Sequence, residues 1–391
     1  MILLSITVAI EGRPENVKKI EDRTMVLKKS SIALQIFLIA FLVLTGCDNK
    51  HARATDDSAL APSLGGYYVY MGHLHNHTSI SGATGTPSEA YTYARDVAKM
   101  DFFGITDHTD TISPALWSAL KTATDSYNQD GVFVTFWGFE WSSSNKYGHV
   151  TIINTSNYCT DSDPNTDTFD ELSAWLSANN GLAFFNHPGR EDTTGEEFYH
   201  FNRAPVDQFV GMELWNKEDG FDVYYYNNGY DRSDNGLGYY DEALSRGWNI
   251  GASGSGDDHY GTWGTRQPFR FAVLAKTKTR AAILDAFLEK RFYSTLDKNL
   301  ALSFKINGHE MGSKINPGTY DVEILADDGS AHDVFKKIEL IKNGSVLLSW
   351  SPNLKTVTIT FSLSVYRGDY YYIRVMQADG DEAVSSPIWI N

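Results

Sequence analysis

The chain has 391 residues, with 33 Lys and Arg, 49 Asp and Glu, 11 His and 2 Cys, and a net charge of −16. This length corresponds to two or three domains of ordinary size, and the composition is that of a globular protein rather than a disordered one. The negative charge argues against a nucleic-acid-binding protein, which would need Lys and Arg for the phosphates. Two Cys cannot form a disulfide framework or a cysteine-ligated zinc module. A metal site would therefore depend on His and carboxylate side chains.

The N-terminal region predicts export and a lipid anchor. Residues 32–44 form an almost entirely apolar stretch of 13 residues that follows Lys28 and Lys29. Such a stretch has the length of a signal-peptide core and is shorter than the roughly 20 residues of a membrane span. The sequence Leu44-Thr45-Gly46-Cys47 resembles the lipobox of bacterial lipoproteins, which implies cleavage before Cys47 and its lipidation. An uncleaved N-terminal anchor is the alternative, and both readings place the protein outside the cytoplasm, facing the periplasm or at the outer membrane or cell surface.

We predict a signal peptide over residues 1–46 and a polar tether over residues 47–65. Residues 1–24 mix both charges, whereas Met25-Val-Leu-Lys-Lys is typical of the start of a signal peptide. This pattern favours Met25 as the initiator.

From residue 66 to residue 298, short apolar runs alternate with helical patterns. The runs that we predict to be strands are 67–72, 102–105, 132–139, 150–153, 181–185, 209–214 and 248–252. Helices are predicted after Thr86, Ser113 and Thr168 and over residues 281–290. Such alternation is typical of β-α-β units. We therefore predict an α/β domain with a mainly parallel sheet, either open or closed into a barrel.

Histidines and carboxylates gather where these predicted strands end. The residues concerned are His73, His75, His77, Asp107, His108, Glu140, His187, Glu213, Asp257 and His259, while His149 stands at the head of its strand. The carboxyl ends of parallel strands meet at one face of a barrel, so we expect these side chains to lie close together. Each His alone is better explained as an ordinary buried or loop histidine. The set as a whole predicts a metal centre.

The order and context of these motifs resemble the PHP (polymerase and histidinol phosphatase) superfamily of metal-dependent hydrolases, over about residues 66–298. The resemblance implies a distorted (β/α)7 barrel, similar to a TIM barrel, with two or three divalent ions such as Zn, Mn or Fe. The implied ligands are His75, His77, His108, Glu140, His149, His187, Asp257 and His259. One ion would take His75, His77, Glu140 and Asp257, a second Glu140, His149 and His187, and a third His108 and His259.

The chain departs from the family pattern at a few positions. Many members carry a further Asp or His ligand five or six residues after the second His, where this chain has Gly82 and Ala83. The third ion would lack that ligand. His73 stands where many members have Asp, and we interpret it either as a residue behind the ligands or as plain surface. Glu213 is expected behind the ligands rather than among them.

The resemblance implies hydrolysis by metal-activated hydroxide, a chemistry that suits phosphate esters. Asp257, His259 and Asp107 are the candidate catalytic residues, for orienting the hydroxide and serving the leaving group. Arg190 and Arg266 lie a few residues after His187 and His259, and each could bind a phosphate or form a surface ion pair.

Two further regions complete the prediction. Residues 189–240, which include Tyr224 and Asp231, are interpreted as a loop that covers the site, with a solvated insertion as the alternative. Seven helix-free apolar runs predict an all-β sandwich over residues 299–391; they are 302–306, 320–325, 335–341, 346–350, 357–363, 370–376 and 386–390. This tail resembles the C-terminal extension of secreted PHP hydrolases, including a branch that cleaves carbamates or esters. His309 and His332 are expected in exposed turns.

We therefore expect an extracytoplasmic metal-dependent phosphoesterase that acts on a small phosphate ester, without a nucleic-acid partner and with a membrane contact through its lipid anchor. The acidic chain disfavours a polyanionic substrate. A carbamate or carboxylic-ester hydrolase is the alternative within this class. A lipoprotein that binds a ligand without converting it is the alternative from a different class.

Overall fold

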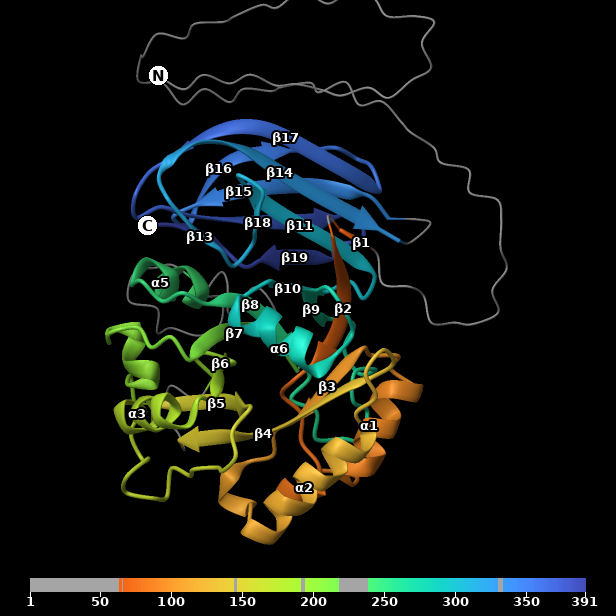
Figure 1. Cartoon of the computed structure of the whole chain (residues 1–391), viewed down its shortest axis with the longest axis vertical. Coiled ribbons are helices and arrows are strands. Elements are labelled where there is room, and N and C mark those ends of the chain that lie inside the picture. The colour runs from red at the N-terminus through yellow and green to blue at the C-terminus, as the bar shows by residue number, and fades with distance from the viewer. Residues whose placement is uncertain (1–62, 65, 144–145, 191–193, 218–237, 330–332) are drawn as a thin grey trace, which may run out of the picture.

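The computed structural model describes residues 63–64, 66–143, 146–190, 194–217, 238–329 and 333–391 (Figure 1). The predicted signal peptide, the lipidation site at Cys47 and most of the tether lie outside these residues, as do Tyr224 and Asp231 of the expected covering loop. None of the helices within the described ranges is long and apolar enough to cross a membrane.

The N-terminal half is a mixed α/β structure around one large curled sheet. Its strands are β1 (Ser63–Leu64), β2 (Tyr67–His73), β3 (Phe102–Ile105), β4 (Val134–Ser143), β5 (Gly148–Ile153), β6 (Leu182–Asn186), β7 (Phe209–Asn216), β8 (Gly251–Ser255), β9 (Arg270–Ala275) and β10 (Phe292–Thr295). The hydrogen-bonded order runs β10-β9-β2-β3-β4-β5-β6-β7-β8. Strands β2, β3 and β4 are parallel to one another, and so are β6, β7 and β8. Strand β5 is antiparallel to both of its neighbours.

The closed (β/α)7 barrel that the resemblance implies is not confirmed. Within the described part of the chain no ladder joins β8 to β9, so the hydrogen-bonded path does not close on itself. Strands β9 and β10 were not among the predicted strands, and β9 lies antiparallel beside β2. The sheet is therefore more mixed than the strand–helix alternation indicates.

Within the described ranges, few helices cover this sheet. They are α1 (Pro87–Asp96), α2 (Pro114–Tyr127), α3 (Phe169–Asn179), α5 (Tyr239–Ser245) and α6 (Arg280–Leu288), with the short 3-10 turns η1 (Ser79–Ser81), η2 (Thr109–Thr111) and η3 (Glu197–Phe201). Helices α1 and α3 begin with complete capping boxes, in which the N-cap Thr and the Glu three residues later satisfy each other's backbone N–H groups. Both helices thus start at the residues that the sequence predicted.

The C-terminal residues form a second, all-β region of two facing sheets. Its strands are β11 (Leu300–Ile306), β12 (His309–Glu310), β13 (Lys314–Ile315), β14 (Gly318–Asp328), β15 (Phe335–Lys342), β16 (Ser345–Trp350), β17 (Thr356–Val365), β18 (Tyr370–Gln377), β19 (Glu382–Ser385) and β20 (Ile388–Ile390). One sheet has the order β12-β11-β14-β17. The other continues the N-terminal sheet, because β19 pairs with β10. His309 is exposed in β12, and His332 lies outside the described residues.

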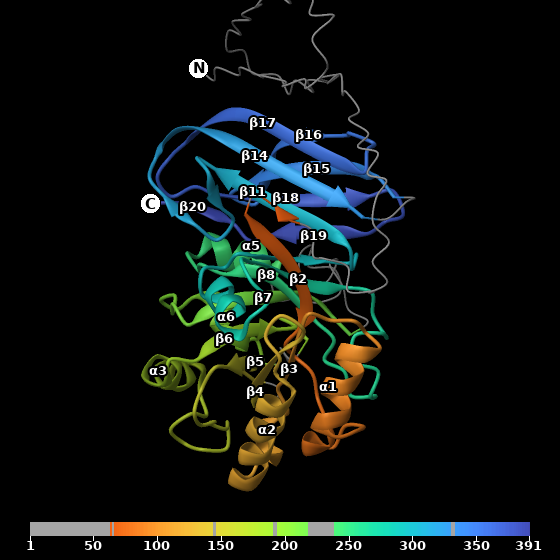
Figure 2. The same ribbon diagram turned by 45° about the vertical axis from the view of Figure 1, so that its right-hand side comes forward.

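A shared apolar core joins the two regions. Leu302 and Ile373 from the C-terminal strands pack in the same buried cluster as Val69, Leu274 and Tyr293 from β2, β9 and β10. Figure 2 shows the C-terminal strands stacked at one end of the molecule and α1, α2 and α3 at the other. The joint sheet and core include β2, and two of the candidate site residues, His75 and His77, follow directly after this strand.

Candidate metal centre

The site residues gather because several strand extensions run side by side beyond the sheet. The N–H of His77 donates to the carbonyl of Asp258 (3.1 Å), and the N–H of Asp257 donates to the carbonyl of His75 (2.9 Å). An isolated bridge likewise joins His108 to Glu140. The segments after β2, β3 and β8 therefore reach the centre together with the end of β4.

His149 reaches this edge because β5 runs in the opposite direction. In the β4–β5 ladder it lies opposite Ser142, and in the β5–β6 ladder opposite Asn186. The first residues of an antiparallel strand lie beside the last residues of its neighbours. This explains why a His at the head of one strand joins others at the ends of parallel strands.

Five imidazoles surround the carboxylate of Glu140, which is fully buried. Its Oε1 lies 3.1 Å from His75 Nε2, 3.2 Å from His149 Nδ1 and 3.6 Å from His187 Nε2. Its Oε2 lies 2.7 Å from His108 Nδ1 and 3.4 Å from His77 Nε2. The Asn186 amide also donates to Oε1 (2.8 Å). Glu140 therefore presents its two oxygens to different sets of imidazoles, and the bridging role that the resemblance implies stays a prediction.

Asp257 faces two kinds of partner with its two oxygens. Oδ1 lies 3.1 Å from His77 Nε2 and 3.5 Å from His75 Nε2. Oδ2 lies 2.8 Å from Lys217 Nζ and 3.1 Å from Arg190 Nη1. One side of this carboxylate thus belongs to the imidazole cluster and the other carries two cationic side chains.

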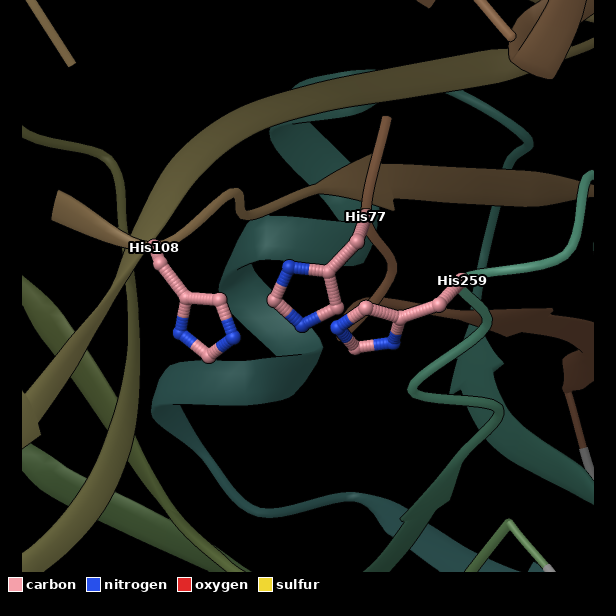
Figure 3. A group of neighbouring side chains, drawn as sticks. All are labelled: His77, His108 and His259. Carbon is pink, nitrogen blue, oxygen red and sulfur yellow. The ribbon is translucent and has the colours of Figure 1, made fainter. Parts of the chain in front are cut away.

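Three groups of side chains bring one ligand atom each within 4.8 Å of one another, as a metal ion requires. They are His75, His77 and Asp257; His75, Glu140 and His187; and His77, His108 and His259. Figure 3 shows the last group, in which the His77 ring lies between those of His108 and His259; its centroid is 4.4 Å and 4.1 Å from theirs. The described residues could thus hold several ions, and His77 joins the pair expected for the third.

The groups differ in detail from the ligand sets that the resemblance implies. His75 stands in the second group where His149 was expected, although His149 Nδ1 lies 3.2 Å from Glu140. All eight residues named as ligands nevertheless lie in or against one cluster, and together they come from six different loops or strands.

Hydrogen bonds behind the cluster fix which ring nitrogens point inward. Glu213 Oε1 lies 3.0 Å from His75 Nδ1, and Glu213 is itself held by the His187 N–H (3.0 Å) and by the Asn216 amide (2.7 Å). Ser81 Oγ donates to Asp107 and so accepts from His77 Nδ1 (3.2 Å). In both His75 and His77, Nδ1 therefore carries a ring proton and Nε2 faces the centre.

The inward donor atoms fit a cation. The two Nε2 atoms of His75 and His77 lie 3.1 Å apart, and two unprotonated nitrogens at this distance repel each other unless a proton or a metal ion stands between them. Glu140 Oε2 is buried and has no hydrogen-bond partner among the described residues; His108 Nδ1 lies 2.7 Å from it and hydrogen-bonds with Ser142 Oγ (2.7 Å). Imidazole nitrogens with carboxylate oxygens are the ligand set of Zn, Mn and Fe sites.

The electrostatics of the cluster also favour positive charge at its centre. Burial lowers the pKa of His75, but Glu140, Asp257 and Glu213 outweigh it and hold that pKa well above its ordinary value. Burial lowers the pKa of His77 to about 4, which keeps this ring neutral and able to coordinate. The pKa of Glu140 is raised by burial but lowered further by the surrounding His, so it lies well below its usual range. The net effect is an ionised Glu140 carboxylate that faces a neutral His77 and a His75 that retains positive charge when no ion is bound.

Two site residues have strained backbones. His187 has φ of 26° and Asp257 has φ of 44°, a region that residues other than glycine seldom occupy. Such strain persists where the surrounding structure fixes the residue, and it concentrates at functional sites.

The structure bears on two of the expected roles. Asp107 was a candidate for serving the leaving group, but both of its oxygens accept hydrogen bonds from Thr78 and Ser81, so it stands behind His77. Arg266 stacks over the exposed ring of Tyr260 at 4.2 Å, whereas Arg190 lies on Asp257 at the centre.

His73 is buried rather than on the surface. Its Nε2 lies 3.0 Å from the carbonyl of Phe269. Burial and the neighbouring Arg270 lower its pKa to about 3, so the ring is neutral. Of the two readings left open for His73, the position behind the ligands fits.

Sequence reasoning missed four residues of this site: Ser81, Asn186, Asn216 and Lys217. Asn186 directly precedes His187, Asn216 is the last residue of the strand that carries Glu213, and Lys217 follows it. The positions of these three residues at strand ends were available signals, but Asn and Lys are too common at such places to be selected. Ser81 lies in η1 and carried no signal of this kind.

No family model matches the chain. An uncharacterized protein of Chlamydia pneumoniae is 23% identical over 357 residues, which is 83% of this chain and 57% of that protein. An uncharacterized protein of Chlamydia muridarum is 27% identical over 137 residues, 31% of this chain and 22% of that protein. The chain thus spans little more than half the length of the first relative.

Among solved structures, the chain is similar to a two-domain protein of Bacteroides vulgatus that contains a predicted PHP-like metal-dependent phosphoesterase. The identity is 14% and the TM-score 0.48, covering 83% of this chain and 95% of the other.

Proposed function

We propose that the protein is a metal-dependent hydrolase and that it acts on a small phosphate ester. The observation that carries this proposal is the convergence of three buried side chains. The Nε2 atoms of His75 and His77 face each other at 3.1 Å, and Glu140 Oε1 lies 3.1 Å from His75 Nε2. Such an arrangement is costly unless a proton or a metal ion lies between the two nitrogens, because buried donor and acceptor groups need partners.

Divalent ions bound here would supply a water of lowered pKa and stabilise negative charge on phosphoryl oxygens. The holding residues would be His75, His77, His108, Glu140, His149, His187, Asp257 and His259. Glu213, and Ser81 with Asp107 behind it, keep the inward nitrogens of His75 and His77 unprotonated and aimed.

Arg190 and Lys217 favour an anionic substrate. Both cations converge on the outer oxygen of Asp257, at 3.1 Å and 2.8 Å. A phosphate that approaches the centre from this side would meet both donors, and Arg can bind two phosphate oxygens at once. A neutral carboxylic ester or carbamate would leave these two charges unused.

In a centre without the third ion, a protonated His259 is the side chain that we assign to proton donation to the leaving group. Its side chain is 29% exposed, and its Nδ1 lies 2.9 Å from the backbone carbonyl of Asp257, which orients the ring. We retain for Asp257 the proposed role of orienting the attacking oxygen. Asp107 has no part in this proposal beyond holding Ser81.

We also propose that the enzyme works outside the cytoplasm, tethered through Cys47. This part rests on the apolar stretch of residues 32–44 and on the sequence around Cys47. Palmitate labelling of the full chain in a bacterial host, with Cys47→Ser as the control, tests it.

The test of the function combines metal analysis with three chromogenic substrates. The full-length protein should contain bound divalent metal by mass spectrometry and should hydrolyse p-nitrophenyl phosphate faster than p-nitrophenyl acetate. Comparison with the bis(p-nitrophenyl) ester assigns monoesters or diesters. His75→Ala should lose both metal and turnover.

His309→Ala is the matched control, because this His is exposed in the C-terminal region, on strand β12. It should keep the metal content and rate of the wild type. A protein that binds no metal, or a His75→Ala variant with an unchanged rate, would refute the proposal. If the protein hydrolyses only p-nitrophenyl acetate, the substrate class would be carboxylic esters and not phosphate esters.

A further inference from the structure

A left-handed turn of ordinary residues lies beside the centre. In η3, residues Phe198, Tyr199 and His200 have φ of 45°, 47° and 49° and ψ of 25°, 32° and 38°, and Phe201 has φ of 59°. L-residues visit this region singly, and four in succession are strongly unfavourable because each Cβ crowds the backbone. Such a turn persists only where its surroundings fix it.

Packing fixes this turn from the core side. Phe198 and Phe201 are almost fully buried, and their rings contact that of Phe185 in β6 at 4.7 Å and 5.4 Å. The Trp248 indole donates to the carbonyl of Phe201 (3.0 Å), and the N–H of Phe198 donates to the carbonyl of Tyr147 (3.1 Å). The turn is thus anchored to β6 and to the residue that precedes β5.

The turn touches the segments of two candidate ligands at once. A methyl group on Gly148, which precedes His149, would lie 2.6 Å from the Phe198 ring and 2.7 Å from Glu197 Cγ. On the other side, the Glu197 carboxylate, buried at 3% exposure, accepts a hydrogen bond from the N–H of Gly189, two residues after His187. Glu197 therefore lies between the backbones that carry His149 and His187.

These two histidines face the same oxygen. His149 Nδ1 and His187 Nε2 lie 3.2 Å and 3.6 Å from Glu140 Oε1, and their ring centroids are 5.1 Å apart. His187 itself has a strained φ of 26°, so its ring position depends on what holds the following residues. The bond from Gly189 to Glu197 is the described contact that holds them from the η3 side.

We infer that Glu197 is a positioning residue, which sets the separation of His149 and His187 and so determines the affinity of the ion that Glu140 shares with them. This inference rests on the proposed function. In this inference the strained turn η3 serves to hold His149 and His187. Neither the packing of the core nor the other two groups of candidate ligands needs η3 for that. Partners behind metal ligands typically change metal affinity by roughly 10- to 100-fold when they are removed.

The experiment is a Zn²⁺ titration of the metal-stripped full-length protein by isothermal calorimetry, with metal content measured by mass spectrometry. Glu197→Ala removes the acceptor and should weaken one ion by about 10- to 100-fold while the others bind as in the wild type. Glu197→Gln keeps an oxygen that can accept from Gly189, and it should bind all ions with wild-type affinity.

Glu310→Ala is the matched control, because Glu310 is also a buried carboxylate that accepts backbone N–H groups, from Phe304 (3.0 Å) and Met311 (3.3 Å), but in the C-terminal region. It should bind every ion normally. If Glu197→Ala does not fold, Glu197→Asp keeps the charge, withdraws the acceptor by one methylene group and should show the same selective loss.

The outcomes separate the two proposals. A wild-type protein that binds no Zn²⁺ refutes the proposed function. A wild type that binds several ions, with Glu197→Ala and Glu197→Asp binding them equally well, overturns the role of Glu197 and leaves the function standing. Equal weakening of all ions, or the same loss in Glu310→Ala, also overturns it.

Discussion

Asp241 offers a measurable link between pH and the junction of the two regions. It lies in α5 with 5% exposure, and its Oδ1 accepts a hydrogen bond from the Tyr372 hydroxyl of β18 (2.6 Å). Burial raises its pKa from 3.8 to about 6, although Tyr372 and Arg374 act in the opposite direction. The folded protein therefore binds the Asp241 proton more tightly than the unfolded chain does.

The sign of the effect follows from this difference. Below pH 3.8 the carboxyl is protonated in both states and costs nothing, whereas above pH 6 the folded protein must bury a charge. A shift of about two units corresponds to about 3 kcal/mol. Asp241→Asn cannot ionise and keeps an oxygen for Tyr372, so it should be more stable than the wild type by about 2–3 kcal/mol at pH 7.5.

Urea unfolding at pH 4, 5, 6 and 7.5 measures this difference for wild type, Asp241→Asn and Asp110→Asn. The gain of Asp241→Asn should shrink towards zero at pH 4, while Asp110, which is exposed, should show no such trend when replaced by Asn. An Asn variant that is equally or less stable than the wild type at pH 7.5, or a gain that does not depend on pH, would refute the reasoning.

Three further predictions concern the metal centre. Ser81→Ala removes the hydroxyl between His77 and Asp107 and should weaken metal binding by roughly 10-fold or more, as measured by competition with a chromogenic chelator; unchanged affinity would contradict the assigned ring orientation. Lys217→Met removes one of the two cations on Asp257 and should raise KM for p-nitrophenyl phosphate roughly tenfold, the effect of one charged hydrogen bond, but leave KM for the acetate ester unchanged; equal effects on both substrates would argue against phosphate binding. Stripping the metal should lower stability by about 2.7 kcal/mol when the free ion had been at 100 times its Kd, and calorimetry with and without chelator should show a lower Tm; an unchanged Tm would mean that no ion binds the folded state preferentially.

The local elements were predictable because their signals are local. The apolar run at 102–105 is β3, and the Thr and Glu residues that open α1 and α3 form the capping boxes that their spacing indicates. Strands β9 and β10 were not predicted, although they flank the predicted helix α6 in the chain. Strand β9 pairs antiparallel with β2 across about 200 residues of chain, and a short apolar run does not disclose so distant a partner.

The chemistry of the site was easier to predict than the roles of single residues. His and carboxylates at strand ends stand out in the sequence, so their gathering could be expected. Asp107 was expected to serve the leaving group, but its partners Thr78 and Ser81 lie 26 to 29 residues away in the chain. Lys217 became visible only when β7 placed it beside Asp257. Roles of this kind depend on contacts that local patterns do not encode.

The reversed strand β5 shows how much the centre depends on register. His149 faces Ser142 on one side and Asn186 on the other, and Asn186 donates to the same Glu140 oxygen that His149 approaches. Side chains alternate along a strand, so a shift of one residue in either ladder would turn His149 away from Glu140. The β4–β5 hairpin must therefore hold its register for an ion to be shared between Glu140, His149 and His187.

Gly148, which has φ of 84° and no space for a side chain against η3, lies at the start of β5. The strained turn and the register of β5 consequently act on the same ligands, and a disturbance of either should affect the ion held by Glu140 and His187 before the one held by His77, His108 and His259.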